Sequence, residues 1–579
     1  MPNFKFWFLL GLVTSLLACG DQSKNVTSSE QKDIENINIR MSKDPKLLHP
    51  IYSPSSASRE LFQYIFTPLA DFHPKTLELI PVIIKEIPEG YNHDVNKESW
   101  VTYLMEIKED ARWSDGQPIT AKDVKFTLNL INHPDAPSTP WKSYFSQIKS
   151  VTLEDNNDKK FGVSFDAAYM LALEAATTIS ILPSHIYDPE GLITELELYD
   201  FMNAEPLENS AFKEIFEKIS ESKNQKLDVV QAGPYKLSAF ETDQYYLLEK
   251  IPDYWGKAYP DIPLLNANVE KLTFLIVPDE LTASTMLKED KLDLVQFSKG
   301  GTFIEMRDDE IIADKYNFHI PPQMKYYYIG INNSRPLLAD KNVRRALTYI
   351  ADVDDYIQSL EGGLGSRTTG NFNPLKTYYN DKLTPIPYDI NKAKQILAEE
   401  GWADSNNDGI LDKVVNNQQT DLELDLYISG GALGKNMALL YQESAKEAGV
   451  KINIVAKKSF ITDHVLKLDY DLALLVSSQD VGTDDPYNRF HSDNIKSPNL
   501  NPTAYGKSEV DDLIDKLRLE RNKEKQTALF HEVQELLYND YPNVYLYCPV
   551  GKIAISNKFN ATTTSKRPGY LANTFESKS

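Results

Sequence analysis

A sustained alternation of strand-like and helix-like segments, from residue 37 almost to the C-terminus, is the feature that most limits what this chain can fold into. Strand patterns occupy residues 100–107, 246–251, 271–277, 326–332, 422–428, 450–456 and 470–476. Helical patterns lie between several of them, such as NKAKQILAEEG and NMALLYQESAKEAG, each closed by a glycine after the last periodic residue. Because no internal repeat interrupts this alternation, we predict an α/β or mixed architecture.

The size and charge of the chain narrow the possibilities further. At 579 residues the chain is too long for one hydrophobic core, so we expect two to four domains. The net charge is −23, and no cluster of lysines and arginines supplies a basic face. Phosphate binding needs such a face, so the composition excludes a nucleic-acid partner.

The N-terminus carries the pattern of an export signal. Lys5 precedes an apolar run over residues 6–17, which is shorter than the roughly 20 residues that a membrane-spanning helix needs. The ending Leu16-Leu17-Ala18-Cys19 resembles the lipobox of bacterial lipoproteins, in which the cysteine is acylated after cleavage. The alternative is an ordinary secretory signal with an incidental cysteine. We predict a signal peptide over residues 1–18 and a lipidated Cys19.

The cysteine count limits how the mature protein is held together. Cys548 is the only other cysteine, so a lipid on Cys19 leaves no partner for an intrachain disulfide. Packing alone must then stabilise the core. The polar stretch that follows Cys19, up to residue 36, is rich in Ser, Asn, Gln and Lys and is typical of a flexible tether.

The stretch ARWSDGQPITAKDVKFTL, residues 111–128, combines a turn with the start of a helix. Ser-Asp-Gly is turn chemistry, and Thr120 with Asp123 forms the sequence pattern of a capping box. Apolar residues then follow on one helical stripe at positions 124, 128 and 131. We expect Trp113 to pack between the strand end and this helix. Asp115 is therefore interpreted as a structural turn residue and not as a catalytic one.

This strand–turn–helix segment resembles a signature of the family 5 extracellular solute-binding proteins of ABC importers. Further segments match that family in the expected order: LHPIYSPSSASRELFQYIFTPLADF, QAGPYKL, IPDYWG, KEDKLDLVQF and YIGINNSRPLLADKNVRRALTYIAD. In IPDYWG, Ile251 stands where the family has Asn. The resemblance covers nearly all of the mature chain.

The resemblance implies an α/β two-lobed clamp of the periplasmic-binding-protein type, in its large form with an inserted subdomain and two hinge crossovers. By motif position, the first part of lobe one covers residues 37–73, the inserted subdomain 74–228 and the second part of lobe one 229–332. Lobe two would follow over 333–545, and the C-terminal part of lobe one over 546–579. The crossovers would lie near residues 326–333 and 543–549, and hinge closure would bury the ligand between the lobes.

The resemblance also implies an anchor for the ligand. In the oligopeptide binders of the family, an Asp that closes a lobe-two strand pairs with the peptide's ammonium group. Aligning the strand that begins at Tyr470 without a gap places Asp480 at this position. The family usually has its Asp/Glu-Pro pair four residues after the anchor, whereas Pro486 comes six residues after Asp480. An insertion upstream would instead make Asp484 the anchor, so both residues remain candidates.

Other ligand contacts follow from the same resemblance. Trp141 matches an aromatic residue that lies over the ligand, and Ser55 and Ser56 fall in the N-terminal loop whose backbone pairs with an extended peptide. An arginine that helps to hold the ligand carboxylate in well-known members is replaced here by Leu474. This departure leaves the ligand length open.

The sequence does not support an enzyme or a metal site. HEVQE (residues 531–535) has Glu535 where a zinc helix needs its second histidine, AYGKS lacks the first glycine of a phosphate-binding loop, and no Gly-x-Ser-x-Gly elbow occurs. Residues 404–412 imitate the start of a calcium loop, but Val415 occupies the position of the bidentate Glu. We interpret that segment as a turn and expect neither a cofactor nor a metal.

The sequence thus predicts a non-catalytic, lipid-anchored binder that captures short peptides outside the cytoplasm, in the periplasm or at the cell surface. It would act as a monomer and deliver them to an ABC permease, with the bilayer as a further partner through Cys19. Two alternatives remain. The same clamp could bind a metal chelate, haem or an oligosaccharide, although no histidine falls in the predicted ligand segments. It could also act as a sensor without a permease.

Overall fold

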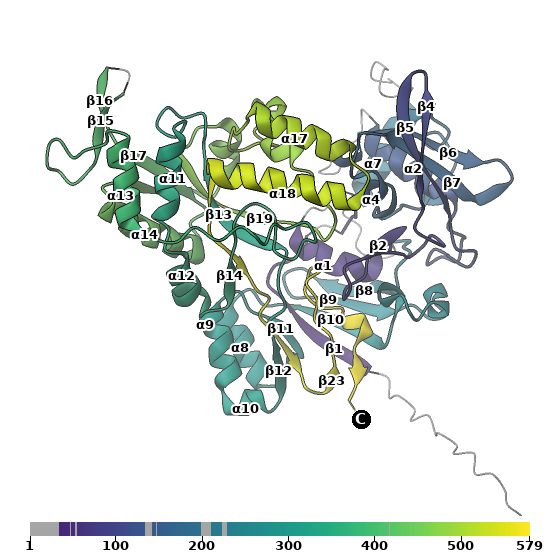
Figure 1. Ribbon diagram of the computed structural model, residues 1–579. Coiled ribbons are helices and arrows are strands. Elements are labelled where there is room, and N and C mark those ends of the chain that lie inside the picture. The colour runs from purple at the N-terminus through teal and green to yellow at the C-terminus, as the bar shows by residue number, and fades with distance from the viewer. Residues whose placement is uncertain are drawn as a thin grey trace, which may run out of the picture.

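Three sheets of four or more strands organise the described chain, each with its own helices (Figure 1). The structure is a computed structural model that describes residues 34–46, 48–51, 55–133, 142–145, 147–198, 210–222, 229–415 and 417–578. Each strand predicted from the sequence is present, with ends that differ by at most two residues. The predicted α/β architecture is therefore confirmed.

A seven-stranded mixed sheet forms the lower part of the molecule in Figure 1, with the order β12-β22-β11-β1-β10-β9-β8. β1 runs parallel to β10 and β11, and the other neighbours are antiparallel. The strands are β1 (Ile34–Met41), β8 (Tyr235–Glu241), β9 (Tyr245–Lys250), β10 (Val269–Ile276), β11 (Leu294–Gln296), β12 (Tyr316–His319) and β22 (Ile553–Ser556).

This sheet separates two hydrophobic cores. Leu294 belongs to one core and its neighbour Val295 to the other, because successive side chains of a strand point to opposite faces. Helix α1 (Ser56–Ile65) covers the first face through Leu61 and Tyr64. The second face is covered by α8 (Glu280–Lys288), α9 (Gly300–Asp308) and α10 (Glu310–Ala313).

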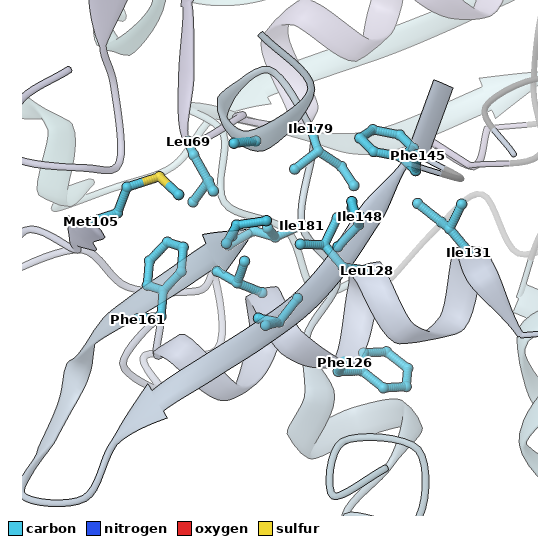
Figure 2. Packing of buried hydrophobic residues seen from close by; sticks show 14 of the residues in the cluster. Leu69, Met105, Phe126, Leu128, Ile131, Phe145, Ile148, Phe161, Ile179 and Ile181 are labelled. Atoms are coloured by element: carbon cyan, nitrogen blue, oxygen red, sulfur yellow. The ribbon is translucent and has the colours of Figure 1, made fainter. Parts of the chain in front are cut away.

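A four-stranded antiparallel sheet, in the order β4-β5-β7-β6, forms a separate group of elements at the upper right of Figure 1. Its strands are β4 (Gly90–Val95), β5 (Glu98–Glu106), β6 (Ile148–Glu154) and β7 (Asn157–Asp166). Its helices are α2 (Ala121–Asn132), α3 (Lys142–Phe145), α4 (Ala172–Thr177), α5 (Ser184–Tyr187) and α7 (Ser210–Ser222). Figure 2 shows Met105, Phe161 and Leu128 among the buried side chains that fill the core between sheet and helices.

The turn before α2 confirms the structural interpretation of its residues. Trp113 is buried, and its indole N–H donates to the carboxylate of Asp123 at 3.3 Å. Asp123 completes the predicted capping box, because it also accepts from the backbone N–H of Thr120 at 2.8 Å. Asp115 accepts from His185 at 2.8 Å and so joins the turn to α5.

Helix α2 differs from the simple amphipathic pattern. The predicted stripe through Val124 and Leu128 is buried, but Lys125 and Asn129 on other faces are buried as well. Asn129 donates to the carbonyl oxygens of residues 193 and 196 at 2.9 Å each. The helix is covered on more than one side because the segment after α5 crosses over it.

A five-stranded sheet, in the order β18-β17-β19-β13-β20, forms the third group of elements. β18, β17 and β19 are parallel, and β13 pairs antiparallel with β19 and β20. The strands are β13 (Lys325–Ile331), β17 (Glu423–Ile428), β18 (Lys451–Ala456), β19 (Leu472–Ser478) and β20 (Asn543–Tyr545). The helices are α11 (Lys341–Tyr349), α12 (Val353–Asp355), α13 (Ile390–Glu399), α14 (Ala432–Glu447), α15 (Phe460–Asp463), α16 (Tyr487–Phe490), α17 (Ser508–Leu519) and α18 (Lys523–Asp540).

Two-stranded pairs complete the fold. They are β2 (Ala70–Phe72) with β3 (Leu79–Pro81), β14 (Gly365–Arg367) with β21 (Tyr547–Pro549), β15 (Asp412–Val415) with β16 (Gln418–Asp421), and β23 (Phe559–Asn560) with β24 (Glu576–Ser577). Gly401 and Gly449 lie two residues after the last residues of α13 and α14, and their positive φ angles of 82° and 79° explain why glycine closes both patterns. Within the described ranges, no helix is long and apolar enough to cross a membrane.

Candidate functional site

A cavity of about 1010 Å³ lies where the three groups of elements meet. The seven-stranded part contributes α1 and the loop at residues 565–568, and the four-stranded part contributes α4. The five-stranded part contributes β13 and residues 477–486, the end of β19 and the loop after it. A volume of this size is at the upper end of ordinary small-ligand sites, so the cavity accommodates a ligand larger than one amino acid.

Aromatic side chains form part of the cavity wall. Tyr326 and Tyr328 of β13 are buried, and their ring centroids lie 5.5 Å apart. Burial raises the pKa of the Tyr328 hydroxyl, and the positive charge of the Arg489 guanidinium opposes that shift. Arg489 itself is exposed and lines the cavity. It therefore adds a positive charge to this wall.

Lys376 binds the backbone of residues 479–486, a segment that we call the 479–486 loop. The Lys376 side chain is only 3% exposed, and its ammonium donates to the carbonyl oxygen of Asp480 at 2.7 Å and to that of Gly482. At the start of the loop, the backbone N–H of Gln479 donates to the carbonyl of Met324 at 2.8 Å. Because these hydrogen bonds hold the backbone at residues 479, 480 and 482, they also fix the positions from which the loop's side chains extend.

The carboxylate of Asp484 is bound by other side chains of the protein. Its carboxylate lies 3.5 Å from the Lys376 ammonium and accepts from the Tyr378 hydroxyl at 2.9 Å and from the Gln479 amide at 3.0 Å. Burial raises the pKa of the Asp484 carboxyl, and Lys376 opposes the shift. Three protein groups thus occupy the carboxylate that was the second candidate for the ligand anchor.

Asp480 has a different environment. Its side chain is exposed and lines the cavity, and its carboxylate accepts no hydrogen bond from another residue in the described part of the chain. Arg567, from the loop before β24, faces the same cavity, and the charge of Asp480 opposes the lowering of the Arg567 pKa by burial. Asp480 is consequently a negatively charged hydrogen-bond acceptor that is open to the cavity, whereas Asp484 is part of the framework.

The other predicted site residues differ in whether they line the cavity. Ser55 caps α1, because its hydroxyl accepts from the backbone N–H of Ser58 at 3.0 Å, and it is absent from the cavity lining. Ser56, the first residue of α1, lines the cavity. Trp141 and Cys19 lie outside the described residues. The roles of Ser55, Ser56 and Trp141 in ligand binding and of Cys19 in lipidation stay predictions.

Leu474, where the family's arginine was expected, packs on the hydrophobic core of the five-stranded part and does not line the cavity. The cations that do line it come from elsewhere in the sequence. They are Lys43, Arg59, Lys325, Arg489, Lys566 and Arg567. None of these stood out in the sequence, because no motif connects segments so far apart.

The acidic turn at residues 404–412 is closed by its own hydrogen bonds. Asp404 accepts from the backbone N–H groups of Asp408 and Gly409 at 3.1 and 3.0 Å, and Asp412 accepts from Ser405 at 2.7 Å. No group of three or more metal-binding side chains occurs in the residues that the structure describes.

Known proteins share both the sequence pattern and the architecture of this chain. The signature of the bacterial extracellular solute-binding proteins, family 5 (middle region), matches residues 97–498. The oligopeptide-binding protein AppA of Bacillus subtilis is 26% identical over 569 residues, which cover 94% of this chain and 93% of AppA. The structure of that AppA with a nonapeptide matches with a TM-score of 0.72 at 21% identity, over 95% of this chain and 100% of the other.

A solved structure with a different kind of ligand matches almost as well. NikZ from Campylobacter jejuni, in complex with Ni(L-His), gives a TM-score of 0.69 at 20% identity and covers 93% of this chain and 99% of NikZ. These likenesses establish the two-lobed binding-protein fold. The family binds solutes and is not catalytic, which confirms the prediction that the chain is no enzyme. The chain belongs to the family 5 bacterial extracellular solute-binding proteins, the solute-capturing components of ABC transporters.

Proposed function

We propose that this protein captures short peptides with a free amino terminus and delivers them to an ABC permease. The observation that carries the proposal is the open carboxylate of Asp480, held by a fixed backbone at the wall of the 1010 Å³ cavity. A desolvated ammonium group is the natural partner of such a carboxylate, because the pair offsets the desolvation of both charges. The similarity to AppA, whose structure contains a nonapeptide, supports this choice of ligand.

In this proposal, the ligand lies between two lobes. Lobe one consists of residues 37–73, 229–332 and 546–579, with residues 74–228 inserted, and lobe two of residues 333–545. The crossovers near 326–333 and 543–549 act as hinges. Ligand contacts made only in the closed form shift the balance towards closure, and the closed form docks on the permease.

The remaining cavity wall suits a peptide. The aromatic rings of Tyr326 and Tyr328 offer apolar surface, and Arg489 offers a positive charge for a carboxylate. Trp141 and the backbone at Ser55 and Ser56 are proposed as further contacts. Micromolar affinity would correspond to about −8 kcal/mol.

The same clamp with a non-peptide ligand is the second candidate, favoured by the likeness to NikZ with its Ni(L-His). Among the described residues, the cavity lining contains no histidine. A chelate would therefore have to supply its own ligands to the metal.

Native mass spectrometry of the mature protein tests the choice between these ligands. The protein would be produced from residue 20 onward, without Cys19, and purified from rich medium. We expect a distribution of co-purified masses that match short peptides. A single non-peptide mass would overturn the peptide assignment and leave the clamp intact.

The anchor is tested with the variant Asp480→Asn and a library of pentapeptides with free termini. Losing one partner of a desolvated charge pair costs about 2–5 kcal/mol, so binding should weaken at least about 30-fold. Asp493→Asn, a 69% exposed carboxylate nearby, is the matched control and should bind like wild type. Unchanged binding by Asp480→Asn would move the anchor away from this residue.

The membrane anchor and the permease are tested separately. A full-length chain expressed in a bacterium should carry a diacylglycerol mass at its new N-terminal Cys19, and Cys19→Ser should be released from membranes. Stimulation of ATP hydrolysis by a reconstituted permease would distinguish delivery from a sensor role. We propose a monomer, which the native mass spectrum checks directly.

A further inference from the structure

The 479–486 loop is also held from the opposite side of the cavity. Glu174, on α4 of the four-stranded part, accepts from the backbone N–H of Thr483 at 3.0 Å through Oε1 and at 3.1 Å through Oε2. The Thr483 hydroxyl adds a third hydrogen bond to Oε1 at 2.9 Å. The two residues are 309 positions apart in the sequence, so this contact bridges two separately folded groups of elements.

Gly482 makes the contact possible. A Cβ at this position would stand 2.5 Å from Oε2 of Glu174 and 3.1 Å from the ring of Phe72. The first distance is shorter than real Cβ contacts allow. Any larger residue would force the carboxylate and the loop apart.

Burial and the neighbouring groups act on the pKa of the Glu174 carboxyl in opposite directions. Burial raises the pKa of its carboxyl, while the donors of Thr483 and the charges of Lys376 and Lys523 oppose that shift. Lys376 is the same ammonium that binds the carbonyl of Asp480. Lys376 and Glu174 therefore bind the backbone of the 479–486 loop from two different sides.

We propose that Glu174 is a positioning residue for ligand binding. Its carboxylate caps Thr483 when the two sides of the cavity approach, and this fixes the loop with Asp480 directed at the ligand. Closure and capture of the ligand's ammonium group are coupled in this way, because one loop takes part in both. The choice of an ammonium ligand rests on the proposed function, whereas the Glu174–Thr483 contact does not.

Two independent measurements test the proposal. The first compares pentapeptide libraries with free and with acetylated amino termini, because only the free ammonium needs a well-placed Asp480. Wild type should prefer the free library, and Glu174→Gln should reduce the ratio of the two affinities about tenfold, since it loses charge-assisted hydrogen bonds. A merely structural role would weaken both libraries alike.

The second measurement reports closure without depending on the ligand's chemistry. Spin labels at Asn92→Cys and Lys516→Cys, both exposed positions, give the distance between the four-stranded part and α17. In a chain without Cys19, the remaining Cys548 is buried, and burial raises its pKa to about 12, so it stays unlabelled. Glu174→Gln, Thr483→Val and Gly482→Ala should each lower the fraction of the short, closed distance.

Matched controls separate these effects from general damage. Glu154→Gln makes the same chemical change on the surface of the four-stranded part, where Glu154 is 54% exposed and lies 3.9 Å from Lys160. Gly301→Ala adds a methyl group where no atom lies within 4 Å. Both controls should match wild type in preference and in distance.

The outcomes are distinct. A Glu174→Gln protein with the wild-type preference and the wild-type distances would overturn the proposal. If wild type itself shows no preference for free amino termini, the proposed peptide function fails, and the distance measurement alone decides the role of the Glu174 contact. A lowered closed fraction then still supports it, and an unchanged one overturns it.

Discussion

At the scale of single residues, burial decides how each charge near the cavity behaves. Glu60 of α1 lines the cavity, and burial raises the pKa of its carboxyl to about 7. The hydroxyl of Tyr570 donates to this carboxylate, and Arg40 lies close enough to act on it, and both oppose the shift. Glu60 therefore titrates near neutral pH in the folded protein and near 4.5 in the unfolded chain.

This difference predicts a pH dependence of stability. A raised carboxyl pKa means that the folded state binds the proton more tightly, so the stabilisation is fully present below pH 4.5 and is lost as the pH rises through 7. We expect the free energy of unfolding to fall by about 2 kcal/mol from this group between pH 5 and pH 8. Urea denaturation of ligand-free protein at several pH values measures it. Glu60→Gln should flatten this part of the profile, and a slope equal to wild type would contradict the assignment.

Lys376 should be essential to the loop that carries Asp480. Lys376→Met leaves the carboxylate of Asp484 partly buried without its cation, which should destabilise the protein by about 3 kcal/mol and weaken peptide binding. The double variant Lys376→Met/Asp484→Asn removes the uncompensated charge and should recover part of the stability but not the binding. Denaturation and titration with the pentapeptide library check both statements.

The control for Lys376 is an ion pair at the surface. Lys291, 63% exposed, lies 2.7 Å from Glu289, which is 50% exposed, so Lys291→Met should change stability by less than about 1 kcal/mol. Equal losses in the two lysine variants would show that burial does not distinguish them.

The site was only partly predictable from single residues. The sequence led to Asp480 and Asp484 through a local alignment, but it left open which of them is free. That distinction depends on Lys376 and Tyr378, which reach the 479–486 loop from more than a hundred residues away. Glu174 lies in ALEAATT, a segment with no polar motif, and only the fold brings it to Thr483.

At the scale of elements, prediction was more successful because the signals are local. β17 (ELDLYI) and β18 (KINIVA) place apolar residues at alternate positions, and β19 (LALLVSS) begins with a continuous apolar run, and both patterns are typical of strands. The glycines after α13 and α14 marked both helix ends. The covering of α2 by the segment after α5 left no such signal, because it depends on contacts between distant segments.

The cap of α2 should be the most costly helix end to remove. Asp123 is 1% exposed and accepts from Thr120, Trp113 and Ser184, so Asp123→Ala should destabilise the protein by about 2–3 kcal/mol. Thermal or urea denaturation measures the loss. Asp279→Ala removes the exposed cap of α8 and should cost only about 1 kcal/mol. A larger loss for Asp279 than for Asp123 would contradict this ranking.

At the scale of the whole molecule, the part of the chain that the structure describes is held by packing and contains no disulfide. Cys548 is free and buried, and burial raises its pKa to about 12. We expect the thermal midpoint of the mature protein to be the same with and without dithiothreitol, and Cys548 to react with a thiol reagent only after unfolding. A midpoint that falls under reducing conditions would reveal a crosslink that this arrangement does not contain.

The position of β19 beside β13 has a consequence for the path of the ligand. The last residues of β19 pair with the first residues of β13, and Gln479 donates to the carbonyl of Met324, where the chain enters the five-stranded part. In the mechanical terms of the proposed two-lobed clamp, Asp480 sits on a short lever arm close to the pivot, and Glu174 sits on the opposing arm. In the proposed function, a bound peptide keeps its amino end on the 479–486 loop through the whole swing, while the opposing wall moves away and opens the route into the permease.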